Sequence, residues 1–221
     1  MMLLGTANFG QTYAGKSVDT ATAFRLLDMA HEAGWGVETS VLYGGAAAIV
    51  FLWPRIPHFL IIKSNVPVLC HADLFMSHGK FDPVHHQAQS IYEPHEAKCV
   101  IVEAPFSILN QSCAPLFENH EVYARSVFAR GAAFTHEPLL EVSTKTGYSI
   151  PELCLGFVES FNPAGIVVGV ESIAQLQELI SLGRFRLPEA VLDLLNTLDL
   201  RLDLRRTFTA APESLADGDS V

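Results

Sequence analysis

The sequence contains few cysteines, and their spacing excludes the common cysteine motifs. Its four cysteines are scattered along the chain, at Cys70, Cys99, Cys113 and Cys154. No two of them form a Cys-x-x-Cys pair, which a zinc ribbon or a thiol–disulfide redox motif would require. We therefore expect reduced thiols in a cytoplasmic protein.

Positive charge and long apolar runs are also scarce. The chain has 14 lysines and arginines against 24 acidic residues, a net charge of −10. This balance argues against nucleic acid or an anionic membrane as the main partner. The most apolar stretch, 46–62, is interrupted by Pro54, Arg55 and Pro57, so it does not read as a membrane span. The first ten residues lack a basic region and include Gly5, which predicts a first strand rather than a signal peptide.

The 221 residues, 49% of them hydrophobic, suit one globular domain. Eight short apolar runs predict strands at 2–9, 37–42, 59–63, 72–77, 87–92, 98–103, 122–128 and 166–170. Helical patterns lie between several of them: one capped by Ser17 or Asp19, one over 46–53, and others from Pro151, from Ser172 and over 191–204. This alternation predicts an α/β fold with a parallel sheet, and eight strands predict a (β/α)8 barrel of the TIM type. We expect one barrel domain over 1–205 and a polar tail over 206–221.

Polar groups stand at the ends of three successive predicted strands. Glu38 and Tyr43 lie in and after the second strand, Lys63 ends the third, and His78 follows the fourth. In a parallel barrel the C-terminal strand ends form the active site. The sequence therefore predicts that these four side chains share one site.

Several motifs resemble the aldo/keto reductase family, and their order strengthens the likeness. Leu-Gly-Thr-Ala-Asn-Phe-Gly (4–10) resembles its first strand, and Glu-Thr-Ser-Val-Leu-Tyr-Gly (38–44) resembles its Asp-Thr-Ala-x-x-Tyr-Gly motif. Ile-Ile-Lys (61–63) and Ala-Asp-Leu-Phe-Met-Ser-His (72–78) are similar to the strands that end in its lysine and histidine. The likeness continues through 89–94, 102–111 and 124–131 to Ile-Val-Val-Gly-Val-Glu-Ser (166–172). It is nearest the subgroup that resembles spore-coat polysaccharide and sugar-biosynthesis reductases.

The resemblance implies that an aldehyde or ketone is reduced by hydride from a nicotinamide. Tyr43 would protonate the forming alkoxide, and Lys63 would assist by stabilising the phenolate. Glu38 would hold Lys63, and His78 would orient the carbonyl. The substrate would be a small carbonyl compound, sugar-like or a biosynthetic intermediate.

The resemblance also implies a site for NADH or NADPH. The residues expected to bind it are Thr6, Ser90, Glu103, Arg125, Ser126, Gly169, Ser172 and Gln175. Gly169 and Ser172 would receive phosphate at the start of a helix, and Arg125 would stack on the nicotinamide. Gln175 stands where the family often has a basic residue for the 2′-phosphate, and Glu171 is acidic. No lysine or arginine lies between Val167 and Gly183, which favours NADH over NADPH.

The chain also departs from the family pattern. Glu38 replaces an aspartate, Ala46 and Ala47 replace Ser-Glu, and Glu103 replaces the glutamine expected at the nicotinamide amide. Only 15 positions separate Lys63 from His78, too few for a strand, an outer helix and its connections. We therefore expect a truncated barrel in which two or three outer helices are missing or reduced around strands three to six. Bare strand faces would favour a homodimer through this side.

Two other functions remain open. A cofactor-free lyase, dehydratase or isomerase would use Tyr43, Lys63 and His78 for proton transfer, and a non-catalytic binding subunit would use none of them. Five histidines crowd the shortened side, at His71, His78, His85, His86 and His95. They lack the spacing of a metal motif, so we expect no metal.

Overall fold

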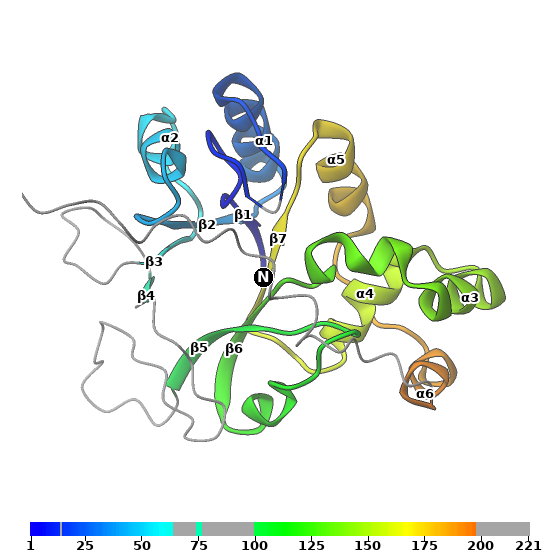
Figure 1. Ribbon diagram of the computed structural model, residues 1–221. Helices are drawn as coiled ribbons and strands as arrows, with labels where there is room; N and C mark the ends of the chain where they lie inside the picture. Colours follow the sequence, from blue (N-terminus) through cyan, green and yellow to red (C-terminus); the bar gives the residue numbers. More distant parts are fainter. Residues whose placement is uncertain (14, 64–73, 77–99, 198–221) are drawn as a thin grey trace, which may run out of the picture.

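A computed structural model describes residues 1–13, 15–63, 74–76 and 100–197 of the 221-residue chain. Seven strands form one sheet: β1 (Met2–Gly5), β2 (Gly36–Ser40), β3 (Leu60–Lys63), β4 (Leu74–Met76), β5 (Val100–Pro105), β6 (His120–Arg125) and β7 (Gly165–Gly169). Their order is β4-β3-β2-β1-β7-β6-β5, and every pairing is parallel. The sheet curls, and helices lie around its outer side (Figure 1).

The helices follow the strands as βα connections require. They are α1 (Thr20–Glu32), α2 (Ala46–Leu52), α3 (Glu137–Thr146), α4 (Ile150–Glu159), α5 (Ile173–Leu182) and α6 (Glu189–Thr197), with 3₁₀ turns η1 (Ala114–Glu118) and η2 (Ala129–Thr135). Local signals fix three helix starts. The side chain of Asp19 accepts from Thr22 N, and that of Ser172 accepts from Gln175 N. Ser149 and Glu152 form a reciprocal capping box before α4.

The structure confirms the truncated parallel barrel. The predicted first, second, third, fourth, sixth, seventh and eighth strands correspond to β1 to β7, and the predicted fifth strand, 87–92, lies outside the described residues. The seventh ends earlier than predicted, at Arg125, because Ser126 turns to a positive φ of 58°. Helix α3 was missed by the sequence analysis, since its apolar positions are few.

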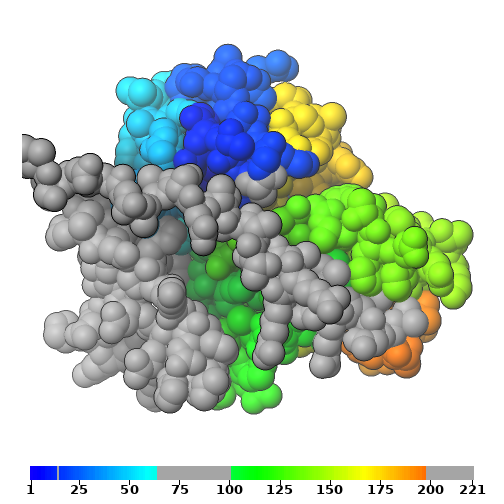
Figure 2. Space-filling view, viewed as in Figure 1, coloured from blue at the N-terminus to red at the C-terminus, as the bar shows by residue number. Residues whose placement is uncertain are grey.

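One outer helix is reduced to a short turn, in the connection between the predicted sixth and seventh strands rather than in the short connections on which the expectation rested. Between β5 and β6 the chain forms only η1, a five-residue 3₁₀ turn, where a full barrel has a helix. The connections from β3 to β4 and from β4 to β5 lie outside the described residues, as does the tail. Helices α2, α1 and α5, by contrast, lie side by side and form a continuous surface (Figure 2). No helix among the described residues is long and apolar enough to cross a bilayer.

Strand residues alternate between the helix-covered face and the barrel interior. Leu3, Ile61, Tyr123 and Val167 form a separate interior cluster, against which Ile101 packs. Leu4, Ile62, Ala124, Ile166 and Val168 belong to the large core under the helices. Two positions further along each of these strands, the side chain points to the same interior face. These positions hold Gly5, Lys63, Glu103, Arg125 and Gly169. Strand alternation thus puts charged groups and glycines in one layer at the C-terminal ends of the strands.

Candidate active site

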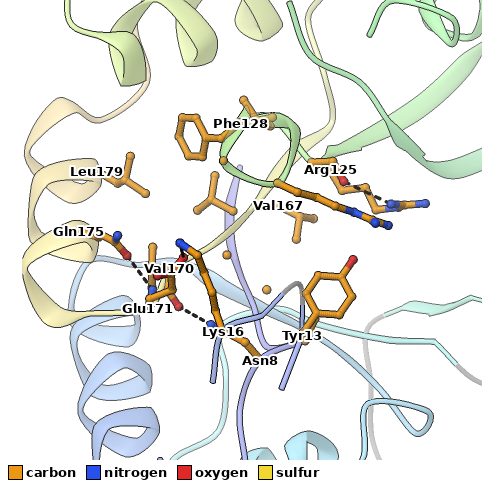
Figure 3. Close-up of a pocket in the computed structure, with 18 of the residues that line it drawn as sticks. Asn8, Tyr13, Lys16, Arg125, Phe128, Val167, Val170, Glu171, Gln175 and Leu179 are labelled. Carbon is orange, nitrogen blue, oxygen red and sulfur yellow. Dashed lines mark hydrogen bonds and ion pairs between the residues drawn. The ribbon is translucent and has the colours of Figure 1, made fainter. Parts of the chain in front are cut away.

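A cavity of about 510 Å³ lies at the C-terminal ends of the strands. Its walls come from the loop between β1 and α1, the segment from β6 into η2, and the start of α5 (Figure 3). Glu38, Tyr43 and Lys63 line its inner end, which we call the floor. Glu171, Gln175 and Glu178 line the other end, which we call the rim. The cavity therefore reaches from three of the predicted catalytic residues to the first turns of α5.

Lys63 is the centre of the floor. Its ammonium nitrogen lies 2.5 Å from the Tyr43 hydroxyl oxygen, 2.5 Å from Glu38 Oε1 and 2.9 Å from Glu103 Oε1. An ammonium has three hydrogens to donate, so these three acceptors use all of them. The structure thus brings together Glu38, Tyr43 and Lys63, as the sequence predicts.

Glu103 makes the floor different from a simple tyrosine–lysine–acid site. Its Oε1 also lies 3.4 Å from Arg125 Nε, so it joins the buried ammonium to a half-exposed guanidinium on the cavity wall. Its side chain is only 3% exposed. Among the described residues, Glu103 Oε2 has no hydrogen-bond partner. Two buried carboxylates therefore share one buried ammonium.

Burial and this charge arrangement shift the pKa values of the floor. Burial raises the pKa of Glu38 to about 7, helped by repulsion from Glu103 and opposed by Lys63. Burial would lower the pKa of Lys63, but Glu38 and Glu103 outweigh it and raise that pKa, so the amine stays charged. Burial and Glu38 raise the pKa of Tyr43 above its ordinary value, against the effect of Lys63. Tyr43 is therefore a neutral phenol that holds its proton at physiological pH.

Gly5 gives the Glu38 carboxylate its space. A β-carbon at position 5 would lie 3.0 Å from Val167 Cγ1 and 3.3 Å from Glu38 Oε2. Any larger residue at this point of β1 would press on the carboxylate that holds Lys63.

Four of the residues predicted to bind a cofactor line the cavity: Arg125, Ser126, Gly169 and Gln175. A β-carbon on Gly169 would meet no atom within 4 Å, so the cavity is open beside it. Among the described residues, Thr6, Glu103 and Ser172 do not line it. Thr6 is buried and its hydroxyl donates to Thr39. Ser90 and His78 lie outside the described residues.

Sequence reasoning missed several cavity residues because they belong to segments without a recognised motif. Tyr13 and Lys16 come from the β1–α1 loop, and Arg130 and Phe134 come from η2. The segment that contains Ser126, Ala129 and Arg130 has positive φ at all three of these residues, 58°, 48° and 56°. Such backbone is costly for residues other than glycine and is concentrated at functional sites.

The described residues contain no group of three or more His, Cys, Asp or Glu side chains arranged to hold a metal ion. The five histidines of the shortened side all lie outside them. Cys113 and Cys154, the two cysteines that the structure describes, are buried free thiols. Cys154 is an unreactive core thiol, because burial raises its pKa to about 12.

Comparison with solved structures identifies the architecture. A scan against models of known protein families gives no match, and a comparison with curated protein sequences also gives none. The holo form of the aldo-keto reductase AKR11C1 from Bacillus halodurans matches with a TM-score of 0.67 and 16% identity, over 93% of this chain and 94% of that one. The aldo-keto reductase MGS-M4, from a Medee basin deep-sea metagenome library, matches at 0.63 and 12% identity, over 90% of both chains.

A third match is a mutant of Gox0644 in complex with NADPH, with a TM-score of 0.62, 12% identity, and coverage of 89% of this chain and 88% of that one. These similarities extend over nearly the whole chain, and they agree with the order of the motifs in the sequence. Identities this low establish architecture rather than activity. The chain therefore has the fold of the aldo-keto reductases.

Proposed function

We propose that the protein is an NAD(P)H-dependent reductase that acts on a small aldehyde or ketone, sugar-like or a biosynthetic intermediate. The observation that supports this most directly is the contact of Lys63 with both Tyr43 and Glu38, at 2.5 Å each, on the floor of a 510 Å³ cavity. An acid, an ammonium and a carboxylate in contact form a complete proton-donating unit. The cavity beside it has room for an extended ligand.

The roles of the chain's own groups follow from the geometry. The Tyr43 hydroxyl accepts from Lys63 and donates to Glu38 Oε1 over a long 3.5 Å, and this proton is the one that it would give to an oxygen on the cavity side. Lys63 offsets negative charge that forms on the phenol oxygen. Glu38 holds Lys63 in position, and Gly5 leaves the space for it. His78 remains the expected group for orienting the carbonyl.

The residues present fit a nicotinamide dinucleotide in two respects. The cavity is continuous from the floor to α5, and it is open beside Gly169. A bound nicotinamide supplies the hydride; Arg125 and Ser126 would flank it near the floor, and Gln175 would lie near its far end. The fold match to a protein in complex with NADPH supports the use of a nicotinamide cofactor.

The test is a titration of the purified protein with NADH and NADPH, followed by assays with a panel of aldehydes and ketones. Wild-type protein should bind at least one cofactor and oxidise it when a carbonyl compound is added. Tyr43→Phe should keep cofactor binding and lose about 10²–10⁴-fold in rate, the usual contribution of a general acid. Tyr148→Phe, outside the cavity, is the matched control and should retain full rate. No binding at millimolar cofactor would refute the reductase.

One observation favours a second function, proton-transfer catalysis without a cofactor. Glu38 has a pKa raised to about 7, which suits a general base at neutral pH. Glu103 replaces the residue expected to bind the nicotinamide amide. A lyase, dehydratase or isomerase would depend on Tyr43 and Lys63 but would turn over substrate in the absence of any dinucleotide. A non-catalytic binding subunit would be unaffected by Tyr43→Phe.

Self-association through the helix-poor side belongs to the same proposal. η1 stands in place of the helix between β5 and β6, and Val102, Ala104, Val122 and Ala124 of these strands are already buried, so a dimer interface would use the remaining surface of this side. Light scattering at micromolar concentration should give the mass of a dimer, and a monomer mass would contradict this part.

A further inference from the structure

The β1–α1 loop, described over residues 6–13 and 15–19, lies over the C-terminal ends of β1 and β7. Phe9 bridges to Val18, and Tyr13 and Lys16 exchange backbone hydrogen bonds of 2.8 and 3.0 Å. The side chain of Asn8 donates to Val170 O at 3.0 Å and fixes the base of the loop to the end of β7. The loop is thereby fixed beside the cavity rim (Figure 3).

Lys16 extends from this loop to the start of α5. Its ammonium nitrogen lies 2.6 Å from Glu171 Oε1, and both side chains line the cavity. Gln175 holds the same turn from the other side, because its Oε1 accepts from Glu171 N at 2.7 Å. In the close-up of Figure 3, Lys16, Glu171 and Gln175 form one chain of contacts across the rim.

Lys16 changes the charge of a rim that would otherwise repel phosphate. The stretch from 167 to 183 contains Glu171 and Glu178 but no lysine or arginine. An anionic group on a ligand at the rim would therefore face two carboxylates. Lys16 cancels the charge of Glu171. Its ammonium has three hydrogens and its side chain is half exposed, so it has donors left for a second partner.

The position of Lys16 defines which part of a ligand it would meet. A dinucleotide that reacts at Tyr43 must place its reacting end on the floor. Its other end, the adenosine, would then lie toward the rim, which Lys16 and Glu171 line. NADPH and NADH differ only at this end, by a phosphate on the adenosine ribose. An ammonium binds a charged phosphate monoester more strongly than it binds a neutral hydroxyl group.

We propose that Lys16 is a specificity-determining residue, which binds a phosphate monoester on the adenosine end of the cofactor and so favours NADPH. This inference rests on the proposed dinucleotide function. Glu171 holds the ammonium at the rim in the free protein, and the phosphate binds the same ammonium in the complex. The preference for NADH drawn from residues 167–183 overlooks Lys16, because the cation comes from the opposite end of the sequence.

The test compares the Kd values of NADPH and NADH by calorimetry in wild-type protein and in Lys16→Ala. Wild type should prefer NADPH. Lys16→Ala should weaken NADPH about 5–10-fold, an amount equal to one partly exposed charged contact, and change NADH less than about twofold. Glu171→Gln should strengthen NADPH, because it removes the competing carboxylate. Lys16→Arg keeps the charge and should restore most of the preference.

Lys145→Ala is the matched control, since Lys145 is an exposed lysine paired with Glu141 on α3. It should leave both Kd values unchanged. Equal weakening of NADPH and NADH by Lys16→Ala would overturn the inference and leave only a loop-supporting role. An unchanged Kd of NADPH in Lys16→Ala would overturn the inference as well. Binding of neither cofactor to wild type would refute the proposed function itself, and the selection with it.

Discussion

Two lysine–carboxylate pairs at opposite ends of one cavity have nearly the same length and different surroundings. Lys63 lies 2.5 Å from Glu38 on the floor, where the two side chains are 9% and 3% exposed. Lys16 lies 2.6 Å from Glu171 at the rim, where they are 50% and 37% exposed. Water screens the rim pair and scarcely reaches the floor pair. Distance alone therefore says little about what an ion pair contributes.

The difference in burial suits two kinds of task. On the floor, the charges are fixed by one another and by the strands, which suits proton transfer to a defined position. At the rim, the ammonium is held by a loop and can exchange one anion for another at small cost, which suits ligand selection. The following predictions test this contrast, from the largest expected effect to the smallest.

Lys63→Met should have the largest effect, because it leaves Glu38 and Glu103 buried without their shared cation. Removing one partner of a buried ion pair costs about 3–5 kcal/mol. Urea unfolding should show a loss of this size, together with loss of turnover. Lys63→Arg keeps the charge and should recover part of the stability. A loss below about 1 kcal/mol in Lys63→Met would show that the floor is not the dry, tightly coupled cluster described above.

The second-largest effect is expected in the pH dependence of stability, through the titration of Glu38. Its folded pKa of about 7 lies above the ordinary value of 4.5, so the folded state holds a proton that the unfolded state releases between these values. The free energy of unfolding should therefore fall as pH rises from about 4.5 to about 7, by roughly 2–3 kcal/mol for this one group. Urea unfolding across this range measures the slope. Glu38→Gln should flatten it, and an unchanged slope in that variant would contradict the assignment.

Glu103→Gln isolates the effect of the second carboxylate. The negative charge of Glu103 raises the pKa of both Glu38 and Tyr43, so its removal should lower both. If ionised Glu38 is needed to hold Lys63, the acid limb of the pH–rate profile should move to lower pH. Glu121→Gln, exposed on β6, should not move it. A limb that stays in place would exclude Glu103 from the proton network and leave it a purely structural partner of Arg125.

The same contrast explains how much could be predicted from the sequence. The floor was predictable because strand alternation and short motifs depend only on nearby residues. The 38–44 motif and the strand that ends at Lys63 bring Glu38, Tyr43 and Lys63 to the same end of the sheet. Asp19, Ser149 and Ser172 cap their helices for equally local reasons. The contact of Glu103 with Lys63 was not foreseen, although Glu103 was named, because it depends on how far the sheet curls.

The rim was not predictable by this reasoning. Lys16 and Glu171 are 155 positions apart in the sequence, and the loop that contains Lys16 has no motif. Its position depends on the long-range hydrogen bond from Asn8 to Val170. The fold brings the Lys16 ammonium to Glu171, in a segment that has no lysine or arginine of its own. The prediction of NADH considered only that segment, so it did not take Lys16 into account.

Lys16→Ala should have the smallest effect on stability, and that result completes the comparison. An exposed ion pair contributes about 0.2–1 kcal/mol, because water solvates the separated charges almost as well. Urea unfolding should therefore place Lys16→Ala within about 1 kcal/mol of wild type, far from Lys63→Met. High salt should reduce even this difference, since exposed charges are screened within about 10 Å at 0.1 M. A loss of several kcal/mol would instead mean that the β1–α1 loop is a stabilising element of the barrel, too costly to release for ligand exchange.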